Sequence, residues 1–524
     1  MDQIQTKPDF KMNTWEAGIM FFLAFDGLYC LAFLTGMLSH YSFSMAFALF
    51  VASYGNITFY IYIVLKYGIT NRSLQCFVGY SLPILIFWIM QYCRSCVESW
   101  YIGNYPYLGI IAHLMCPVAI MAFSIPIKKA TNKIIFWIVF LSLFIMSLLI
   151  FITWYDWILS GHSARSLKFL TDEKRIINTL WITGNKAGYF IASIGLFLAL
   201  LSLYGKYTKQ IRIEFASIGY FIGSTLFYFV SVRGLLIGWI VVHCLLVIIT
   251  GIWQKKEFFI IVPIILALNI FLLFHVGKVD STRLLDRIKT TIEVINNDTS
   301  SIKKIMNIES ENINDNKISA TISQQPTSQQ LIYSQPIFQQ SNSTVKTFSN
   351  IEMIVVASPY SLPRGIIQQQ RSELLEASDR VLYNKLSNIF NMDVRSAIYL
   401  IAIDRIMANP ILGYGNSLVL KIDDIYYRVN VHCNVLGVTL SLGLVGLTLY
   451  LIILIRGACD AVIIFTSMPE YGWIAVIFLF SFFGHFFDKY TIDMLSFWIP
   501  IVVMRSCVKT HSYKLKEQIL PETN

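Results

Sequence analysis

Residues 434–454 read NVLGVTLSLGLVGLTLYLIIL, an apolar run that contains no charged side chain. Runs of roughly 17 to 25 apolar residues recur along the chain, and a helix of that length crosses about 30 Å of hydrocarbon. Hydrophobic residues make up 56% of the 524 residues and charged residues 14%, which is more apolar surface than a soluble core of this size can bury. Because helices satisfy their own backbone hydrogen bonds in lipid, the sequence predicts an all-α polytopic membrane protein.

Basic residues follow the predicted spans in a regular alternation. With the N-terminus in the cytoplasm, the even-numbered connections include residues 66–72, 128–133, 206–212 and 255–256 and Arg456, and each of them carries Lys or Arg. Short cytoplasmic loops have this excess, so the pattern predicts a multi-pass protein with both termini in the cytoplasm. The net charge of +10 is spread between apolar runs rather than gathered on one domain, so we expect no nucleic acid partner. The candidate transmembrane spans are 16–37, 43–65, 73–92, 104–126, 134–156, 186–204, 213–231, 234–252, 258–275, 434–455, 471–487 and 490–508.

One connection, 276–433, is far longer than the others and is predicted to be a domain outside the membrane. Residues 1–275 hold the first nine spans, residues 434–508 hold the last three, and residues 509–524 form a cytoplasmic tail. The alternation of spans places the long connection on the outer side of the membrane.

The composition changes twice within this outer domain. Near 296–350 the chain is rich in Gln, Ser and Asn, and its low apolar content predicts a disordered insertion. Apolar residues then return at helical intervals in RSELLEASDRVLYNKLSNIF (371–390) and in VRSAIYLIAIDRIMANP (394–410). These two stretches predict amphipathic helices near the membrane surface.

Ionisable residues on the outer side are candidate sites, because charges at the mouth of a membrane bundle are costly. Basic residues are scarce in the short outer connections, with Arg94, Arg233 and Lys489 as exceptions. Arg233 lies between two apolar runs without an acidic neighbour in sequence. Its side chain either extends to the membrane–water interface and marks a helix end, or binds a phosphate group through its guanidinium. Arg395 begins the second amphipathic helix, where a solvated surface charge is the simpler interpretation. His432 directly precedes the apolar run at 434, where an imidazole is either merely interfacial or a proton acceptor.

Taken together, these segments resemble the O-antigen ligase and polymerase superfamily. The resemblance is carried by RSAIYLIAIDRIMANPILGYGNS (395–417), by VNVHCNVLGVTLSLGLVGLTLYL (429–451), by TGNKAGYFIASIGLFLALLSLYG (183–205) and by SVRGLLIG (231–238). In the family, a late periplasmic loop is followed by a helix that begins with a His and carries two glycines, as His432, Gly443 and Gly446 do here. The chain departs from the family in having Cys433 after the His, and the Gln-rich insertion has no counterpart in the family pattern.

The resemblance implies a GT-C-like fold of about twelve transmembrane helices with one large periplasmic loop, in the bacterial inner membrane. It implies transfer of a polyprenyl-diphosphate-linked glycan donor to an acceptor hydroxyl at the periplasmic face, among membrane lipids. Arg233 and Arg395 would bind the diphosphate, and His432 would be the catalytic base or orienting group. We expect a metal-independent glycosyltransferase without a cofactor.

Several activities fit this resemblance. The first is an O-antigen ligase, whose acceptor is lipid A-core, and the second is an O-antigen polymerase, whose acceptor is another glycan. A protein O-oligosaccharyltransferase is the third enzyme hypothesis. A glycan flippase or transporter is the alternative from another class, and it predicts ionisable residues in the middle of the membrane. Most predicted spans lack such residues, with Asp26 in the first span as an exception, and Asp26 is either a packed, hydrogen-bonded core acid or a residue that lines a conduit.

Overall fold

Helices make up most of the structure that the computed structural model describes. The described residues are 12–24, 57–67, 81–102, 117–127, 129–159, 185–230, 233–250, 263–264, 267, 354–357, 386, 394–415, 418–422, 425–429, 431, 433–485 and 495–519. The elements are α1 (Thr14–Ala24), α5 (Leu82–Ile102), α7 (Lys129–Leu159), α10 (Asn185–Tyr207), α11 (Ile213–Val230), α12 (Arg233–Thr250), β1 (Ile354–Ala357), α18 (Val394–Ala408), β2 (Leu418–Ile422), β3 (Ile425–Val429), α19 (Asn434–Ser467), the 3₁₀ turn η5 (Pro469–Tyr471), α20 (Gly472–His485) and α21 (Leu495–Ile519).

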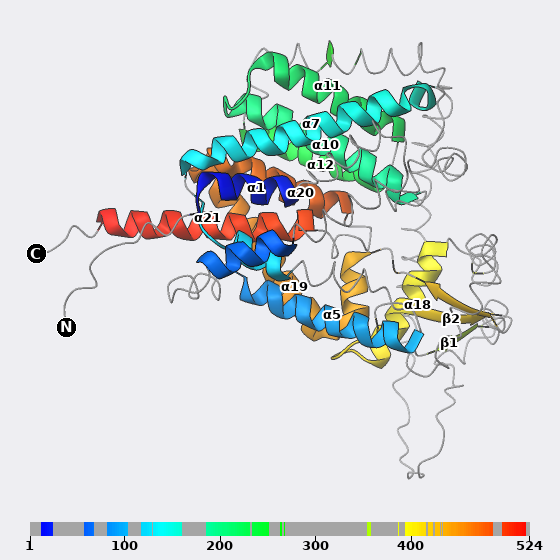
Figure 1. Ribbon diagram of the computed structural model, residues 1–524. Coiled ribbons are helices and arrows are strands. Elements are labelled where there is room, and N and C mark those ends of the chain that lie inside the picture. Colours follow the sequence, from blue (N-terminus) through cyan, green and yellow to red (C-terminus); the bar gives the residue numbers. More distant parts are fainter. Residues whose placement is uncertain are drawn as a thin grey trace, which may run out of the picture.

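The long helices lie side by side in a bundle (Figure 1). α10 and α11 form an antiparallel hairpin, and both helices pack against α7. α20 contacts α12 and α21, while α19 contacts α5, α20 and α21. The turn between α10 and α11 therefore lies at one end of the bundle, and α18 and the strands lie at the other end (Figure 1).

Two of the described helices are long and apolar enough to cross a membrane. They are α19 and the stretch Thr131–Leu148 of α7, and shorter apolar stretches occur in α1, α5, α10, α11, α12 and α20. The outward-facing positions are apolar too, as α19 shows with its exposed side chains Leu444, Leu451, Ile455 and Val462. A helix that is apolar on both its buried and its exposed faces suits a lipid environment better than water. The structure thus has the helical, apolar character that the sequence predicts.

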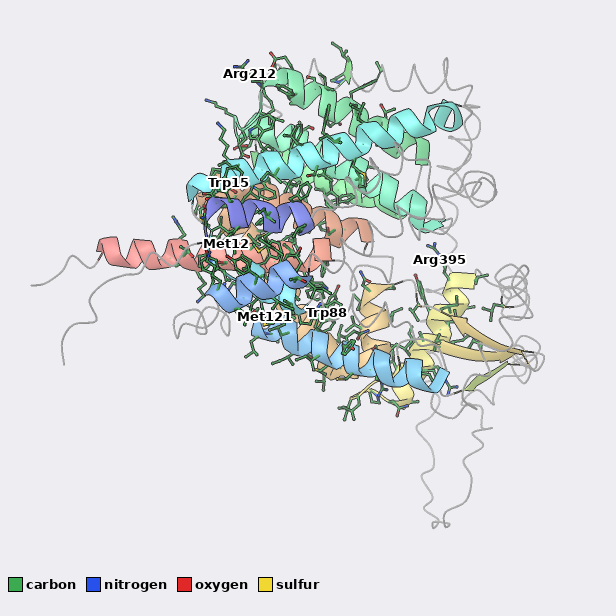
Figure 2. The ribbon with its side chains drawn as sticks, in the orientation of Figure 1. Met12, Trp15, Trp88, Met121, Arg212 and Arg395 are labelled. Atoms are coloured by element: carbon green, nitrogen blue, oxygen red, sulfur yellow. The ribbon has the colours of Figure 1, made fainter. Side chains whose placement is uncertain are left out.

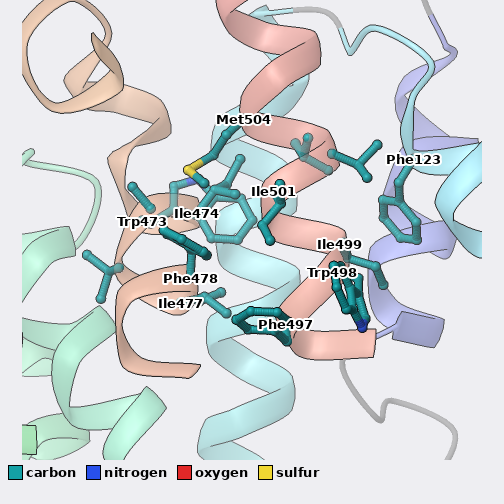
Figure 3. Close-up of a cluster of buried hydrophobic side chains, with 14 of the residues drawn as sticks. Phe123, Trp473, Ile474, Ile477, Phe478, Phe497, Trp498, Ile499, Ile501 and Met504 are labelled. Atoms are coloured by element: carbon teal, nitrogen blue, oxygen red, sulfur yellow. The ribbon is translucent and has the colours of Figure 1, made fainter. Parts of the chain in front are cut away.

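The core of the bundle is rich in aromatic rings where α20 meets α21 (Figure 3). Trp473 and Phe478 on α20 and Phe497 and Trp498 on α21 are all buried. The rings of Phe478 on α20 and Phe497 on α21 meet across the two helices, with centroids 6.2 Å apart and planes at 34°. Such contacts between aromatic rings stabilise the packing of the last two helices.

The turn η5 is tied to helices that are distant in sequence. Asn132 on α7 and Gln210 beyond α10 donate side-chain hydrogen bonds of 2.5 and 2.8 Å to the carbonyl oxygen of Glu470. The indole nitrogen of Trp473 in turn donates a 3.0 Å bond to the amide oxygen of Asn132. Two side-chain donors from distant parts of the chain therefore meet at one carbonyl oxygen, which fixes this end of the bundle.

A small sheet and α18 form a cap at the other end of the bundle (Figure 1). The strands are antiparallel in the order β1-β2-β3, with Ile354 opposite Ile422 and Leu418 opposite Val429. Leu418 and Val429 pack with Ile398 of α18 in a core separate from that of the bundle. Our prediction of an all-α chain did not include this sheet. Its strands IVVA, LVLKI and IYYRV are short, but their β-branched and aromatic residues favour extended structure.

The helix boundaries agree with the predicted spans at most starts and differ at several ends. α18 confirms the second amphipathic helix, and it ends two residues before Pro410. α19 begins at the predicted residue but continues past Arg456 to Ser467, and α21 runs beyond 508 to Ile519. A charged side chain that reaches the surface does not interrupt backbone hydrogen bonding, so the charge does not mark the helix end. The insertion near 296–350 and the first amphipathic helix, 371–390, lie outside the described residues apart from Leu386.

Candidate functional site

A break in α19 is the feature around which the end of the structure that carries α18 and the strands is organised. At Gly443, φ is 65° and ψ is −162°, a conformation that is essentially restricted to glycine. Gly413, in the turn that follows α18, also has a positive φ, of 76°. A Cβ added to Gly413 would lie 2.6 Å from the amide nitrogen of Gly443, and a Cβ added to Gly443 would overlap the carbonyl oxygen of Ile411. The two backbones therefore touch where only glycine fits.

The turn after α18 replaces hydrogen bonds that the break removes from α19. The carbonyl oxygen of Leu440 accepts bonds from the backbone N–H groups of Tyr414 at 2.6 Å and Gly415 at 3.0 Å. Beyond the break, the N–H of Leu444 donates a 2.7 Å bond to the carbonyl oxygen of Pro410. Broken helices are tolerated at membrane depth where neighbouring backbone satisfies the freed groups, and this turn does so.

α5 contributes two polar side chains to the same junction. Arg94 donates a 3.1 Å hydrogen bond from its guanidinium to the carbonyl oxygen of Gly413. Ser441, two residues before the break, donates a 3.0 Å bond to the side-chain oxygen of Gln91. Sequence reasoning singled out Arg94 only as a basic residue on the outer side. The signal that it missed is that Gln91 and Arg94 lie three residues apart on one face of α5, directly after its apolar first half.

Arg395 lies in the first turn of α18, and its side chain is exposed. Figure 2 shows it at the end of the structure opposite Arg212 and Trp15. α11 runs back from the Arg212 end, and only two residues separate its end from Arg233, the first residue of α12. The backbone of Arg233 therefore lies at the same end of the bundle as Arg395. The structure does not describe the side chain of Arg233.

His432 also lies outside the described residues, but both of its neighbours are described. Val431 and Cys433 pack in the same small core as Ile401 and Ile406 of α18. The chain on either side of His432 is thus held against the helix that carries Arg395. The structure places the neighbours of His432 against α18 and the start of α12 at the same end of the bundle. It does not describe how the side chains of His432 and Arg233 are oriented.

An exposed apolar surface adjoins the break in α19. Ile403 and Met407 on α18 and Ile411 and Leu412 in the following turn are 45 to 72% exposed. Val445, just beyond the break, is exposed as well, and its N–H donates to the carbonyl oxygen of Ile411 at 3.5 Å. Such a surface suits contact with lipid chains.

Nothing matches this chain in comparisons with protein-family models, curated proteins or solved structures. The resemblance to the O-antigen ligase and polymerase superfamily therefore rests on the sequence motifs. Among the described residues, no group of three or more His, Cys, Asp or Glu side chains is arranged to hold a metal ion.

Proposed function

We propose that this chain is a membrane-embedded O-antigen ligase, with about twelve transmembrane helices in the bacterial inner membrane. In this proposal it transfers a glycan from a polyprenyl-diphosphate carrier to lipid A-core at the periplasmic face. The observation that carries the proposal is the contact between Gly413 and Gly443. Each glycine belongs to a different motif of the resemblance, and their contact joins the two motifs into one structural unit at the C-terminal end of α18, whose first turn carries Arg395.

The proposed reaction follows from the chemistry of the three candidate residues. The bond between the anomeric carbon and the carrier phosphate breaks, and the acceptor hydroxyl oxygen forms the new glycosidic bond. The guanidinium groups of Arg233 and Arg395 stabilise the negative charge that develops on the departing polyprenyl diphosphate. His432 accepts the proton that the acceptor hydroxyl loses. In this scheme the two arginines supply the positive charge that the leaving group requires.

The apolar surface beside the break in α19 gives the carrier lipid a place to approach. Met407, Ile411 and Leu412 expose large side chains next to the helix that carries Arg395. A polyprenyl chain is apolar and its diphosphate is anionic, and α18 has an exposed apolar surface near its C-terminal end and Arg395 in its first turn. This arrangement supports a lipid-linked donor over a soluble nucleotide sugar.

The test is complementation of a strain that lacks this gene, with its lipopolysaccharide separated on a gel. Single variants Arg233→Ala, Arg395→Ala and His432→Ala are expected to abolish transfer while membrane levels of the protein stay normal. Arg405→Ala is the matched control, because Arg405 lies on α18 but pairs with Asp404 at 3.2 Å. Transfer at the wild-type level in the three variants would overturn the assignment of these residues.

The pattern on the gel separates the activities of the superfamily. Bare core with accumulated lipid-linked polymer supports the ligase, whereas core capped with single repeats supports the polymerase. An unchanged ladder with an unglycosylated protein acceptor supports a protein O-oligosaccharyltransferase.

A glycan transporter is a second candidate, which one observation favours. Asp460 on α19 and Arg505 on α21 form a buried ion pair between helices of the bundle, and buried charges of this kind mark transport paths in many membrane proteins. Asp26, the residue that the sequence offers for this role, lies outside the described residues. Glycan transfer by the purified protein in detergent, where no transport can occur, would contradict the transporter hypothesis.

A further inference from the structure

The turn between α10 and α11 holds a lysine in an unusual backbone conformation. Lys209 has φ of 58°, and it is the one non-glycine residue with positive φ among the residues that the structure describes. The N–H of Gln210, the next residue, donates a 2.8 Å hydrogen bond to the carbonyl oxygen of Gly205, which ends α10 in a left-handed cap. Glycine usually occupies this position, so a lysine here carries a conformational cost that its ammonium group can offset by binding a ligand.

A cavity of about 460 Å³ lies between this turn and α7. Four cations line it: Lys133 on α7, and Lys206, Lys209 and Arg212 from the end of α10 and the turn. Lys133, Lys209 and Arg212 are exposed, and within the described part of the chain no ion pair joins any of these three to a carboxylate. The three exposed positive charges around one small cavity repel one another unless an anion is bound. We call this site the basic pocket.

Two aromatic rings form the apolar side of the basic pocket. Trp137 on α7 and Phe215 on α11 line the cavity, and their rings meet edge to face with centroids 5.9 Å apart. Phe215 is 47% exposed, and Ile218 lies one helical turn further along α11 with similar exposure. Tryptophan in this setting is typical of the boundary between headgroups and hydrocarbon. The pocket therefore offers positive charge at its mouth and an apolar surface beside it.

The position of the basic pocket in the bundle agrees with this boundary. Arg212 lies at the same end as Trp15 and at the end opposite Arg395 (Figure 2). Residues 206–212 are one of the basic connections that the charge pattern places in the cytoplasm. The pocket is thus remote from the proposed transfer site, on the other face of the proposed membrane.

We propose that the basic pocket binds the phosphate of an anionic phospholipid from the cytoplasmic leaflet. A phosphate accepts hydrogen bonds from several cations at once, and basic pockets between helices on this side of a membrane are suited to lipid headgroups. Phe215 and Ile218 distinguish a lipid from a free phosphate, because they give the acyl chains apolar contact. The inference rests on the membrane location in the proposed function, but not on glycan transfer.

The test uses the purified full chain in detergent and counts bound lipid by native mass spectrometry. Phosphatidylglycerol is titrated as the anionic probe, with phosphatidylcholine and inorganic phosphate as separate arms. Lys133→Gln/Arg212→Gln removes two exposed cations of the basic pocket, and we expect the affinity for phosphatidylglycerol to fall roughly 30-fold. Lys209→Asn removes a third cation and keeps a residue type that tolerates positive φ, so it is expected to weaken binding without loss of folding.

Lys66→Gln/Arg405→Gln is the matched control. It also removes two positive charges, but these cations pair with Glu16 and Asp404, outside the pocket. Wild-type affinity in the control and weak binding in the pocket variants support the proposal. Equal affinity for phosphatidylcholine, unchanged binding in Lys133→Gln/Arg212→Gln, or inorganic phosphate that binds as tightly as the lipid would each overturn it. None of these readouts depends on glycan transfer, so the inference and the proposed function can fail separately.

Discussion

The guanidinium of Arg505 on α21 donates a 2.9 Å hydrogen bond to the carboxylate of Asp460 on α19, inside the bundle. Asp460 is 2% exposed, and the side chain of Arg505 is 15% exposed. Asp460 lies beyond Arg456, in the part of α19 that extends past the predicted span. The pair therefore links two helices at a point where the sequence predicted a loop.

Asp460→Ala is expected to destabilise the protein strongly. It leaves the Arg505 guanidinium buried without its carboxylate partner, and the loss of one member of a buried ion pair costs about 3–5 kcal/mol. A thermal unfolding measurement on the detergent-solubilised protein, followed by the fluorescence of the buried Trp473 and Trp498, would detect this change.

The double variant Asp460→Leu/Arg505→Met separates the charge effect from packing. Both charges are removed together and replaced by apolar side chains of similar size, so most of the lost stability should return. If the double variant is as unstable as Asp460→Ala, the destabilisation comes from packing rather than from an unpaired charge.

Gly443→Ala is expected to lower the free energy of unfolding by more than about 3 kcal/mol. A Cβ there would overlap the carbonyl oxygen of Ile411, and the φ of 65° is unfavourable for alanine. Gly437→Ala is the matched control in the same helix, since no atom lies within 4 Å of the added methyl group. Alanine at that helical position is expected to raise stability by about 0.5–1 kcal/mol. Similar melting temperatures for the two variants would contradict the contact between the turn and the break.

Gly223→Val is expected to separate α10 from α11. The two helices approach closely at Gly195 and Gly223, and a Cβ on Gly195 would lie 2.6 Å from the carbonyl oxygen of Gly223. Gly219 precedes Gly223 by four residues, which gives the small-residue spacing that lets membrane helices pack backbone to backbone. Ile218→Val, at an exposed position of α11, is the control and should leave the melting temperature unchanged. A stable Gly223→Val protein would show that the helices can move apart without cost.

The positions of the helices were largely predictable from the sequence, because apolar runs of membrane-spanning length have a simple signature. The starts of α10, α11, α12 and α19 lie within one residue of the predicted starts. The break at Gly443 was not predictable as a structural feature. A glycine in an apolar helix is common, and its conformation here depends on the turn at Gly413, which lies 30 residues earlier in the sequence and contacts it only in the fold.

The candidate site was predictable in part, for a related reason. Arg395 was placed correctly at the beginning of a helix, because Asn409 and Pro410 mark where that helix ends. Arg94 was not recognised as part of the junction, since its partner is a backbone carbonyl oxygen, and no pattern of side chains reveals such a partner. The basic pocket was interpreted only as a topology signal, because its cations come from two connections that meet only in the fold.

Arg94→Gln is expected to loosen the junction between the turn and α19 while the bundle stays folded. Arg94 donates to the carbonyl oxygen of Gly413, and a hydrogen bond from a charged group contributes about 1.5–3 kcal/mol. The backbone N–H groups of Tyr414 and Gly415 should therefore exchange with deuterium roughly tenfold faster or more, because their bonds to Leu440 depend on the position of this turn.

Exchange elsewhere in the chain provides the internal comparison for this variant. The amides of the α10–α11 hairpin are remote from Arg94 and should exchange at the wild-type rate, which distinguishes local loosening from global instability. Arg405→Gln, which removes a guanidinium from α18 without touching Gly413, should leave the exchange of Tyr414 and Gly415 unchanged. If Arg94→Gln changes neither amide, the turn is held by the glycine contact with α19 alone.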